Sequence, residues 1–545
     1  MKKFLIAIPV LLAGVLYWAL AQTAPAALAT LFPPGALVYL EARDFSTLLA
    51  GWDSSAEKRA WLQSANYQEF SRSRLFLRLH DAQSEFAAAA GVPPDYALVS
   101  SIAGGNSALA IYNIGELQFL YITHLASARA MATALWNARG HYQTRHAGGV
   151  DYYVKEDAAS HRVAAFAYAG DLLIVATKED LIAGALQLLE HPGASLVSEG
   201  WFSNANQAAP AGANDLRLVY DLNRLRATPH FRSYWIQRNA SALAEFSSGL
   251  ADLEFARGEI RERRVLLRAN PATAPDESAT GPLLAAAPED AGFYRAWLNP
   301  SAEQARRLIE EKIFSATPAP AIPNNGAPAV VTTADAGTEQ DLETRIDEAP
   351  IRDDRVAAAF QALQERLAPV KLTGMLQVEK THAGDVFAGT DSAIVLLASA
   401  DWDANAIRAA FAQAAGSLWS VDGMGALDGL AKINVAVAGR WLIAGNSPDL
   451  VKEILARRNR PAVPGADYAA EWRHARELPD FERITRLIDF PQIPPADPNG
   501  AREPMFYSEN LAGLGRVLGR VESAGIAVHD AGAMLRESVI YRMAP

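Results

Sequence analysis

A segment that occurs twice constrains the fold of this chain more than any other feature. Residues 163–189 read VAAFAYAGDLLIVATKEDLIAGALQLL, and residues 433–455 read INVAVAGRWLIAGNSPDLVKEIL. Thirteen positions starting at Ala169 and Ala438 align without gaps, and six of them are identical. Each copy places a glycine between two apolar runs and continues into an amphipathic stretch. The pattern predicts strand, tight turn, second strand and helix, as one structural plan used twice.

The local chemistry of the two copies specifies turns and helix starts. Gly170 and Gly439 should form the tight turns, where glycine tolerates positive φ. Thr177 is the expected N-cap of the first helix, and Asn446 or Ser447 that of the second. Leu181 and its counterpart Leu450 should be buried one turn later. The apolar stripe expected on the first helix is Leu181, Ala185, Leu188 and Leu189.

The rest of the chain predicts an α+β fold. We expect two homologous halves, 30–275 and 280–545, each an antiparallel sheet with helices packed against it, because strand meanders are separated by single helices. Half of the 545 residues are hydrophobic and 20% are charged, which suits large buried cores. The pattern of apolar residues further predicts a helix over Tyr67–Ala90, a strand over Ala97–Ile102 and a helix around Ala240–Gly249.

One stretch interrupts the second half. Residues 315–350 combine prolines with acidic residues and contain few large apolar side chains. Such a composition buries too little apolar surface to offset the entropy of ordering, so we expect a disordered insertion. A helix is expected further on, over Leu511–Val521, where leucines recur on one face.

The first 21 residues predict export. Lys2 and Lys3 precede a run of uncharged residues from Phe4 to Leu20, and Ala19-Leu20-Ala21 suits a signal-peptidase site. The run of 17 residues is also at the lower limit for a membrane-spanning helix, so an uncleaved anchor is the alternative to a cleaved signal. Either way we expect the protein to be exported, and to be periplasmic or anchored in the inner membrane facing the periplasm.

A family resemblance supports the same location. The apolar N-terminus, the segment PPGALVYLE at residues 33–41, the hairpin AGDLLIVAT at residues 169–177 and the helix after it resemble a family of exported bacterial proteins. That family is known only as a domain of unknown function. The resemblance implies an envelope location, and it transfers no catalytic residue to this chain.

No catalytic motif is complete in the sequence. Ser55-Ala-Glu-Lys58 matches the S-x-x-K pattern of penicillin-recognising serine enzymes, in which the lysine helps to deprotonate the serine. The companion motifs are missing, because Lys380-Thr381-His382 lacks the glycine of K-T-G. We therefore interpret Ser55 as the start of an exposed helix. No phosphate-binding or G-x-S-x-G pattern occurs, and we assign no catalytic or cofactor-binding residue and no cofactor.

Metal and nucleic-acid sites are not expected either. The ten histidines are scattered, and the closest pair, His141 and His146, is poorly spaced for a shared metal ion. The chain has no cysteine, which excludes disulfides and thiolate metal sites. A net charge of −11 argues against nucleic acid as a partner. The partner is unknown, apart from the membrane if the N-terminal segment is not cleaved.

These observations favour a non-catalytic envelope protein that binds or scaffolds. Two alternatives stay open. One is a hydrolase-like enzyme with an unrecognised site, which a deep cleft with converging His, Ser and acidic groups would favour. The other is a carrier of an apolar ligand, held in a cavity between a sheet and its helices. A closed, dry core would count against the carrier.

Overall fold

The computed structural model describes residues 28–210, 212, 214–229, 243–274, 280–314, 354–383, 388–415, 420–421, 432–477 and 520–544. The expected N-terminal signal or anchor (1–21), the insertion (315–350) and most of the helix expected near residue 511 lie outside these ranges. Among the described residues no helix is both long and apolar enough to cross a membrane. The chain divides into two compact units. Unit 1 runs to Thr273 and includes Ala531–Glu537, which the sequence analysis assigned to the second half; unit 2 holds the remainder.

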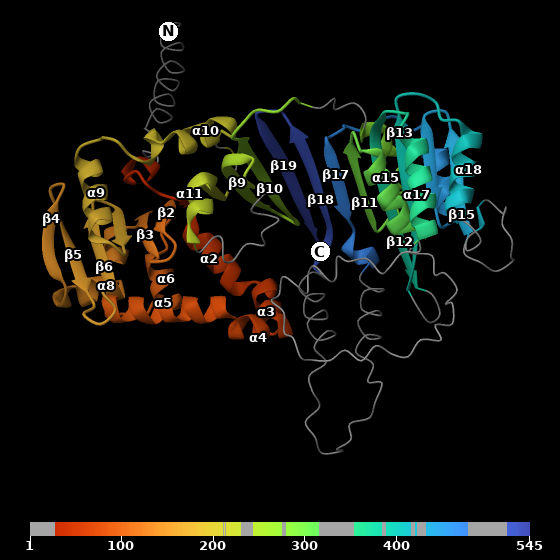
Figure 1. Ribbon diagram of the computed structural model, residues 1–545. Helices are drawn as coiled ribbons and strands as arrows, with labels where there is room; N and C mark the ends of the chain where they lie inside the picture. Colours follow the sequence, from red (N-terminus) through yellow and green to blue (C-terminus); the bar gives the residue numbers. More distant parts are fainter. Residues whose placement is uncertain are drawn as a thin grey trace, which may run out of the picture. The chain divides into compact units, whose positions relative to one another are not determined.

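Unit 1 is built on an antiparallel sheet (Figure 1), in which every pairing between neighbouring strands is antiparallel. The order across the sheet is β10-β9-β8-β1-β2-β3-β7-β6-β5-β4. The strands are β1 (Val38–Ala42), β2 (Ser107–Asn113), β3 (Gln118–His124), β4 (Gln143–Ala147), β5 (Val150–Glu156), β6 (Val163–Ala169), β7 (Leu172–Ala176), β8 (Leu216–Asp221), β9 (Phe246–Ala256) and β10 (Glu259–Arg268).

Helices cover both faces of this sheet. One face packs against η1 (Leu28–Leu31), α9 (Glu179–Glu190) and α10 (Gly200–Ala208), and the other against α5 (Arg74–Ala90), α6 (Tyr96–Ile102), α7 (Ser127–Met131) and α8 (Ala134–Ala138). Side chains alternate between the faces, as the strand period requires. On β7, for example, Ile174 belongs to the first core and Leu173 and Val175 to the second. The predicted α+β class, with antiparallel sheets and packed helices, is confirmed.

Unit 2 has an antiparallel sheet of its own, in the order β18-β17-β11-β12-β13-β16-β15, with a short β14 parallel to β15. Its strands are β11 (Phe293–Leu298), β12 (Leu372–Ala383), β13 (Ala388–Ala398), β14 (Ser420–Val421), β15 (Lys432–Ala438), β16 (Trp441–Gly445), β17 (Tyr468–Trp472) and β18 (Val521–Asp530). Its helices are α14 (Thr280–Ala286), α15 (Ala302–Ile309), η4 (Glu310–Phe314), α17 (Asp354–Leu367), α18 (Ala404–Ala415) and α19 (Pro448–Arg457).

The strand order is the same in both units along six consecutive strands. β8-β1-β2-β3-β7-β6 in unit 1 corresponds to β17-β11-β12-β13-β16-β15 in unit 2. Gly170 and Gly439 start the corresponding hairpin turns with φ of 65° and 59°. Leu181 and Leu450 are 8% and 2% exposed. The repeated plan and the descent of the two halves from one ancestor both stay predictions.

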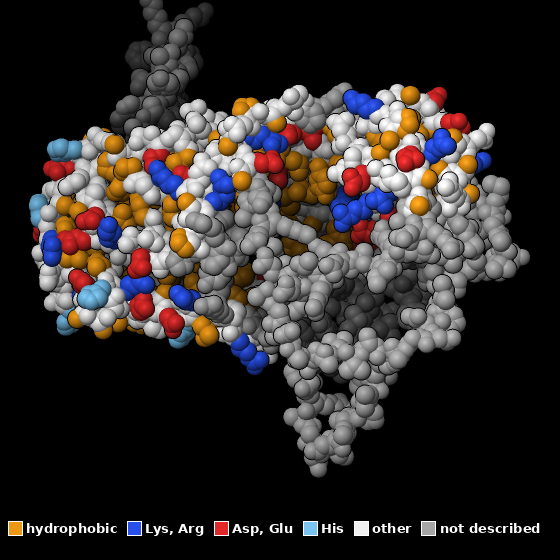
Figure 2. All heavy atoms as spheres, viewed as in Figure 1, with side chains coloured by type: hydrophobic (Ala, Val, Ile, Leu, Met, Phe, Trp, Pro, Cys, Tyr) orange, Lys and Arg blue, Asp and Glu red, His pale blue; other side chains and the backbone are white. Residues whose placement is uncertain are grey.

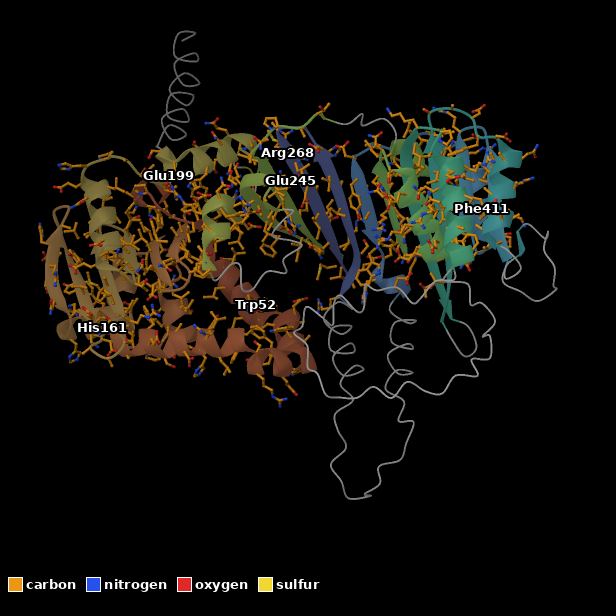
Figure 3. All side chains as sticks on the ribbon, in the orientation of Figure 1. Trp52, His161, Glu199, Glu245, Arg268 and Phe411 are labelled. Atoms are coloured by element: carbon orange, nitrogen blue, oxygen red, sulfur yellow. The ribbon has the colours of Figure 1, made fainter. Side chains whose placement is uncertain are left out.

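The two units differ on one corresponding face. In unit 2, η4, α17 and α18 close that face with Phe314, Phe360 and Phe411, respectively, which are almost completely buried (Figure 3 labels Phe411). The rings of Phe314 and Phe360 meet edge to face with centroids 4.9 Å apart. In unit 1, α5 crosses the strand direction on that face (Figure 1), and its aromatic residues remain partly exposed.

Two predicted elements are wrong. Residues 97–102 form α6 instead of a strand, because Asp95 caps the helix and its Oδ1 accepts a hydrogen bond from the Leu98 amide at 2.9 Å. A short apolar run is ambiguous between the two structures when its period is unclear. The helix expected around Ala240–Gly249 is replaced by β9 from Phe246 onward. Gly249 is needed in that strand, because a Cβ there would lie 2.6 Å from the Tyr220 ring.

The predicted helix boundaries also need correction. The helix expected over Tyr67–Ala90 is broken at Ser73, which caps the start of α5. Lys178 occupies the N-cap of α9, and no side chain makes a capping bond there, so Thr177 is not its cap. The buried residues of α9 are Leu181, Ile182, Ala185 and Leu186, which shifts the predicted stripe. Ser447 does cap α19.

Candidate functional site

A pocket of about 480 Å³ lies on the sheet face of unit 1 that α5 and α6 cover. Its walls come from six strands, four helices and the segments that connect them, which are far apart in the chain. The lining residues are overwhelmingly apolar: Leu40, Ala42, Phe45, Leu79, Ala82, Gln83, Phe86, Pro94, Leu98, Val99, Ile102, Ser107, Ala108, Leu109, Glu116, Leu117, Phe119, Tyr121, Leu135, Arg162, Val163, Val175, Thr177 and Leu216.

The sheet supplies one wall through alternate residues of neighbouring strands. Leu40 on β1, Leu109 on β2 and Phe119 and Tyr121 on β3 face the pocket, while their chain neighbours Leu120 and Ile122 are buried in the opposite core. Because side chains alternate between the two faces of a strand, one set of each strand's side chains packs in a filled core and the other set lines the pocket.

Helix α5 supplies the facing wall. Leu79, Ala82 and Phe86 lie three and four residues apart, which places them on one face of the helix. Leu79 is 50% exposed, so this wall leads from the pocket to the surface. Helix α6 contributes Leu98 and Ile102 from its own inner face.

Aromatic pairs stand at the two ends of the pocket. Phe86 and Phe119 stack with ring centroids 6.5 Å apart, and Phe45 and Tyr121 meet edge to face at 6.4 Å. Burial raises the pKa of the Tyr121 phenol above its usual range, against the opposing effect of hydrogen bonds with neighbouring hydroxyls. That hydroxyl donates to the carbonyl of Ile102 at 3.1 Å.

The hydroxyls near the Phe45 end satisfy one another. Ser107 Oγ and Thr123 Oγ1 lie 2.6 Å apart, and Tyr121 Oη is 3.3 Å from Ser107 Oγ. Ser107 Oγ also reaches the carbonyl of Gly105 at 3.1 Å. Because these polar atoms already have partners, this end does not require a polar ligand group.

Charged side chains gather at the opposite end, which we call the mouth. It is formed by Arg162, Glu85 on α5, and Glu116 in the β2–β3 turn. Arg162 Nε donates to Glu85 Oε2 at 2.7 Å, and its Nη1 donates to the carbonyl of Glu116 and to Glu116 Oε2, the latter at 3.3 Å. The Arg162 side chain is 27% exposed and that of Glu116 64%. The guanidinium thus joins α5 to the β2–β3 turn.

Strained backbone flanks these charges. Leu117, next to Glu116, has φ of 47°, and His161, next to Arg162, has φ of 56° (Figure 3 labels His161). Non-glycine residues rarely adopt these values, and such strain collects at functional sites. Thr177 holds one of the two turns, because its hydroxyl accepts from the Phe119 amide at 2.8 Å and donates to the Leu117 carbonyl at 2.9 Å.

The pocket can enclose an apolar molecule, and its polar groups do not form a catalytic arrangement. Ser107 lies at one end of β2, and Glu116 lies beyond the other end. No histidine is among the described residues that line the pocket. Within the described ranges, no cluster of three or more His, Cys, Asp and Glu side chains could hold a metal ion.

The residues singled out in the sequence lie elsewhere. Ser55 caps α3 (Ala56–Leu62), where its Oγ accepts from the Lys58 amide at 3.0 Å and donates to the Trp52 carbonyl at 2.8 Å. Lys58 forms an ion pair with Asp53 and lies over the Tyr96 ring. The serine hydroxyl and the lysine amine are therefore engaged separately.

The remaining candidates are also placed by local contacts. His146 bonds Asp151 at 2.9 Å on the exposed strand β4, and His141 lies in the preceding 3₁₀ turn. Lys380 pairs with Asp290 at 2.5 Å and Glu453 at 2.6 Å in unit 2. Figure 2 shows acidic, basic and apolar side chains interspersed on the visible face of unit 1.

Comparison with known proteins finds little. No model of a known protein family matches the chain, and no curated protein matches it. Two crystal structures of TP0453 align with part of it. Crystal form I is 10% identical over 44% of this chain and 77% of TP0453, with a TM-score of 0.25, and crystal form III is 10% identical over 46% and 83%, with a TM-score of 0.24. At these TM-scores the likeness carries no argument, and the family resemblance drawn from the sequence stays an expectation.

Proposed function

We propose that this chain is an exported cell-envelope protein whose unit 1 binds one single-chain apolar or amphipathic molecule. The observation that carries the proposal is the pocket of about 480 Å³. Ligand pockets are typically about 300–1,000 Å³, and a dry apolar cavity of about 150 Å³ already accepts benzene. The envelope location rests on the N-terminal pattern, from Lys2-Lys3 to Leu20.

The shape of the pocket favours a ligand with an extended hydrocarbon chain over one with a compact ring system. Lining residues extend from Ser107 at one end of β2 to Glu116 beyond the other. Six residue steps of about 3.4 Å along that strand span roughly 20 Å. The lining also crosses the sheet from Leu216 on β8 to Val163 on β6, so an extended hydrocarbon chain is the ligand that we propose.

A carrier fits the site better than the hydrolase alternative. The pocket wall offers apolar contacts along its length, and its hydroxyls are engaged with one another or with backbone carbonyls. A serine hydrolase needs a base within hydrogen-bond reach of its nucleophile. Among the residues that the structure describes, the partners of Ser107 are Thr123, Tyr121 and a backbone carbonyl. Binding without chemical change is therefore the function that the geometry supports best.

Binding of Nile red, an uncharged dye that fluoresces in apolar sites, tests the proposal on the full chain. We expect saturable binding with one site, lost in Ala82→Phe, whose ring would enter the pocket. Ser84→Phe places the same ring on the exposed side of α5 and should leave binding intact. Equal binding by all three proteins would show that the dye binds elsewhere, and absence of saturable binding to the wild type would also refute the proposal.

A further inference from the structure

The charges at the mouth indicate which kind of molecule the pocket accepts. Glu116 and Arg162 are the ionisable side chains that line the pocket, apart from the Tyr121 phenol. Both lie at the same end. The other wall residues are apolar or hydroxyl-bearing, apart from Gln83, whose amide donates to the Pro94 carbonyl at 3.3 Å. A hydrocarbon chain bound along β2 would therefore place its polar end beside Arg162 and its apolar end beside Phe45 and Tyr121.

The mouth does not favour a negatively charged group. Arg162 contributes one positive charge, and Glu85 and Glu116, its two ion-pair partners, contribute two negative charges. The turn that leads to Arg162 adds Lys155 but also two acidic residues, Glu156 and Asp157. A carboxylate or phosphate entering here would have to compete with two carboxylates for one guanidinium, at a mouth with a net negative charge.

Arg162 nevertheless offers a hydrogen-bond donor to an uncharged oxygen. Its Nε and Nη1 carry all of its side-chain hydrogen bonds to the described residues, to Glu85 and Glu116. Guanidinium has a further pair of N–H groups on Nη2, and it has no acceptor of its own. An ester or ketone oxygen can accept from Nη2 without displacing either ion pair.

We propose that unit 1 selects a single-chain amphiphile with an uncharged, oxygen-bearing end, such as an alkyl ester, and that Arg162 donates a hydrogen bond to that oxygen. This inference rests on the proposed function, because it requires the pocket to hold the chain. To the proposed function it adds the direction in which the ligand enters, a hydrogen bond from Arg162 to the polar end of the ligand, and weaker binding of the free acid with the same alkyl chain.

Competition against Nile red on the full chain tests the inference with four ligands of equal chain length: methyl dodecanoate, dodecanoate, dodecane and dodecyltrimethylammonium. At pH 8 the ester should compete at least about fivefold better than dodecanoate, a ratio that corresponds to one unit charge at contact distance in water. It should also compete better than dodecane. The gap between ester and acid should shrink at high salt, because exposed charges are screened.

Two variants separate the hydrogen bond from Arg162 to the ligand oxygen from the effect of charge at the mouth. Glu116→Gln, at a well-exposed side chain, should improve binding of dodecanoate about fivefold with little change for the ester. Arg162→Met should remove the advantage of the ester over dodecane. A chain series of esters should gain about fourfold per added CH₂ until the pocket is full.

Each contrary outcome has a distinct meaning. A preference for dodecanoate or for the trimethylammonium ligand in the wild type would overturn the inference, as would an unchanged ester-to-alkane ratio in folded Arg162→Met. Should that variant fail to fold, an unchanged acid affinity in Glu116→Gln would overturn the charge argument by itself. If none of the four ligands displaced the dye, the proposed function itself would fail.

Discussion

A matched pair of substitutions on α5 tests whether the pocket is unfilled space. Ala82 and Ala89 lie seven residues apart, so they occupy the same face of the helix two turns apart. Ala82 lines the pocket, whereas Ala89 is fully buried in the core that α5 forms with the sheet. We compare Ala82→Phe with Ala89→Phe, because the added group and the helix are the same.

The expected magnitudes follow from the space at each position. At Ala89 the ring enters a packed core, and overpacking costs about 1–3 kcal/mol or more. At Ala82 it enters a pocket of about 480 Å³, roughly three times the volume that accepts benzene. Filling such space typically stabilises by about 0.5–2 kcal/mol. The two variants should therefore differ by about 1.5–5 kcal/mol in the free energy of unfolding.

Hydrogen exchange followed by mass spectrometry is the suitable assay, because a chain with two units need not unfold in one step. Peptides covering β2 and β3 report the opening free energy of unit 1 alone. We expect faster exchange than wild type in Ala89→Phe and equal or slower exchange in Ala82→Phe. Equal destabilisation by both substitutions would refute the reasoning, since it would show that the pocket wall is as tightly packed as the core.

Three further predictions concern stability. Arg217 and Asp252 form a buried bidentate ion pair at 2.7 Å. By hydrogen exchange in unit 1, Arg217→Ala should cost about 3–5 kcal/mol, while replacement of both residues by leucine should cost much less. Equal costs would contradict this. Burial raises the pKa of Tyr142 to about 12. The protonated phenol therefore contributes fully to the free energy of unfolding below pH 10, and this contribution is lost as the pH rises from 10 to 12. Tyr142→Phe should make the loss of stability over this range less steep, and an unchanged pH dependence would count against the prediction. Leu181→Ala and Leu450→Ala should each cost roughly 2–5 kcal/mol, measured by hydrogen exchange in peptides of the unit that holds the leucine. A cost near zero for either would disprove its core role.

The sequence predicted the elements that have a clear period or a local signal. The hairpin glycines Gly170 and Gly439 and the cap Ser447 were recognisable because their chemistry is local. Residues 97–102 were misread because six residues are too few to distinguish a buried strand from a helix. Thr177 was assigned to the wrong element, since its hydroxyl bonds the distant turn at Leu117 and leaves the next helix uncapped.

The pocket could not be predicted from the sequence. Leu109 and Phe86 line it, and in the sequence they look the same as core residues such as Leu120. Whether an apolar face is filled or open depends on the side chains that meet it from elsewhere, as the three phenylalanines that close unit 2 illustrate. Arg162 carried no signal either, because its partners lie 77 and 46 residues away in the chain.

Photocrosslinking of a bound chain tests the central claim most directly. The full protein is irradiated with a dodecyl ester that carries a diazirine at the end of its chain, and labelled peptides are mapped by mass spectrometry. We predict labels on the pocket walls, chiefly at Phe45 and in peptides containing Ile102 and Leu109, that Ala82→Phe suppresses. Labels confined to unit 2 or to exposed surfaces, or labels that Ala82→Phe leaves unchanged, would contradict the assignment of unit 1 as a carrier of an apolar chain.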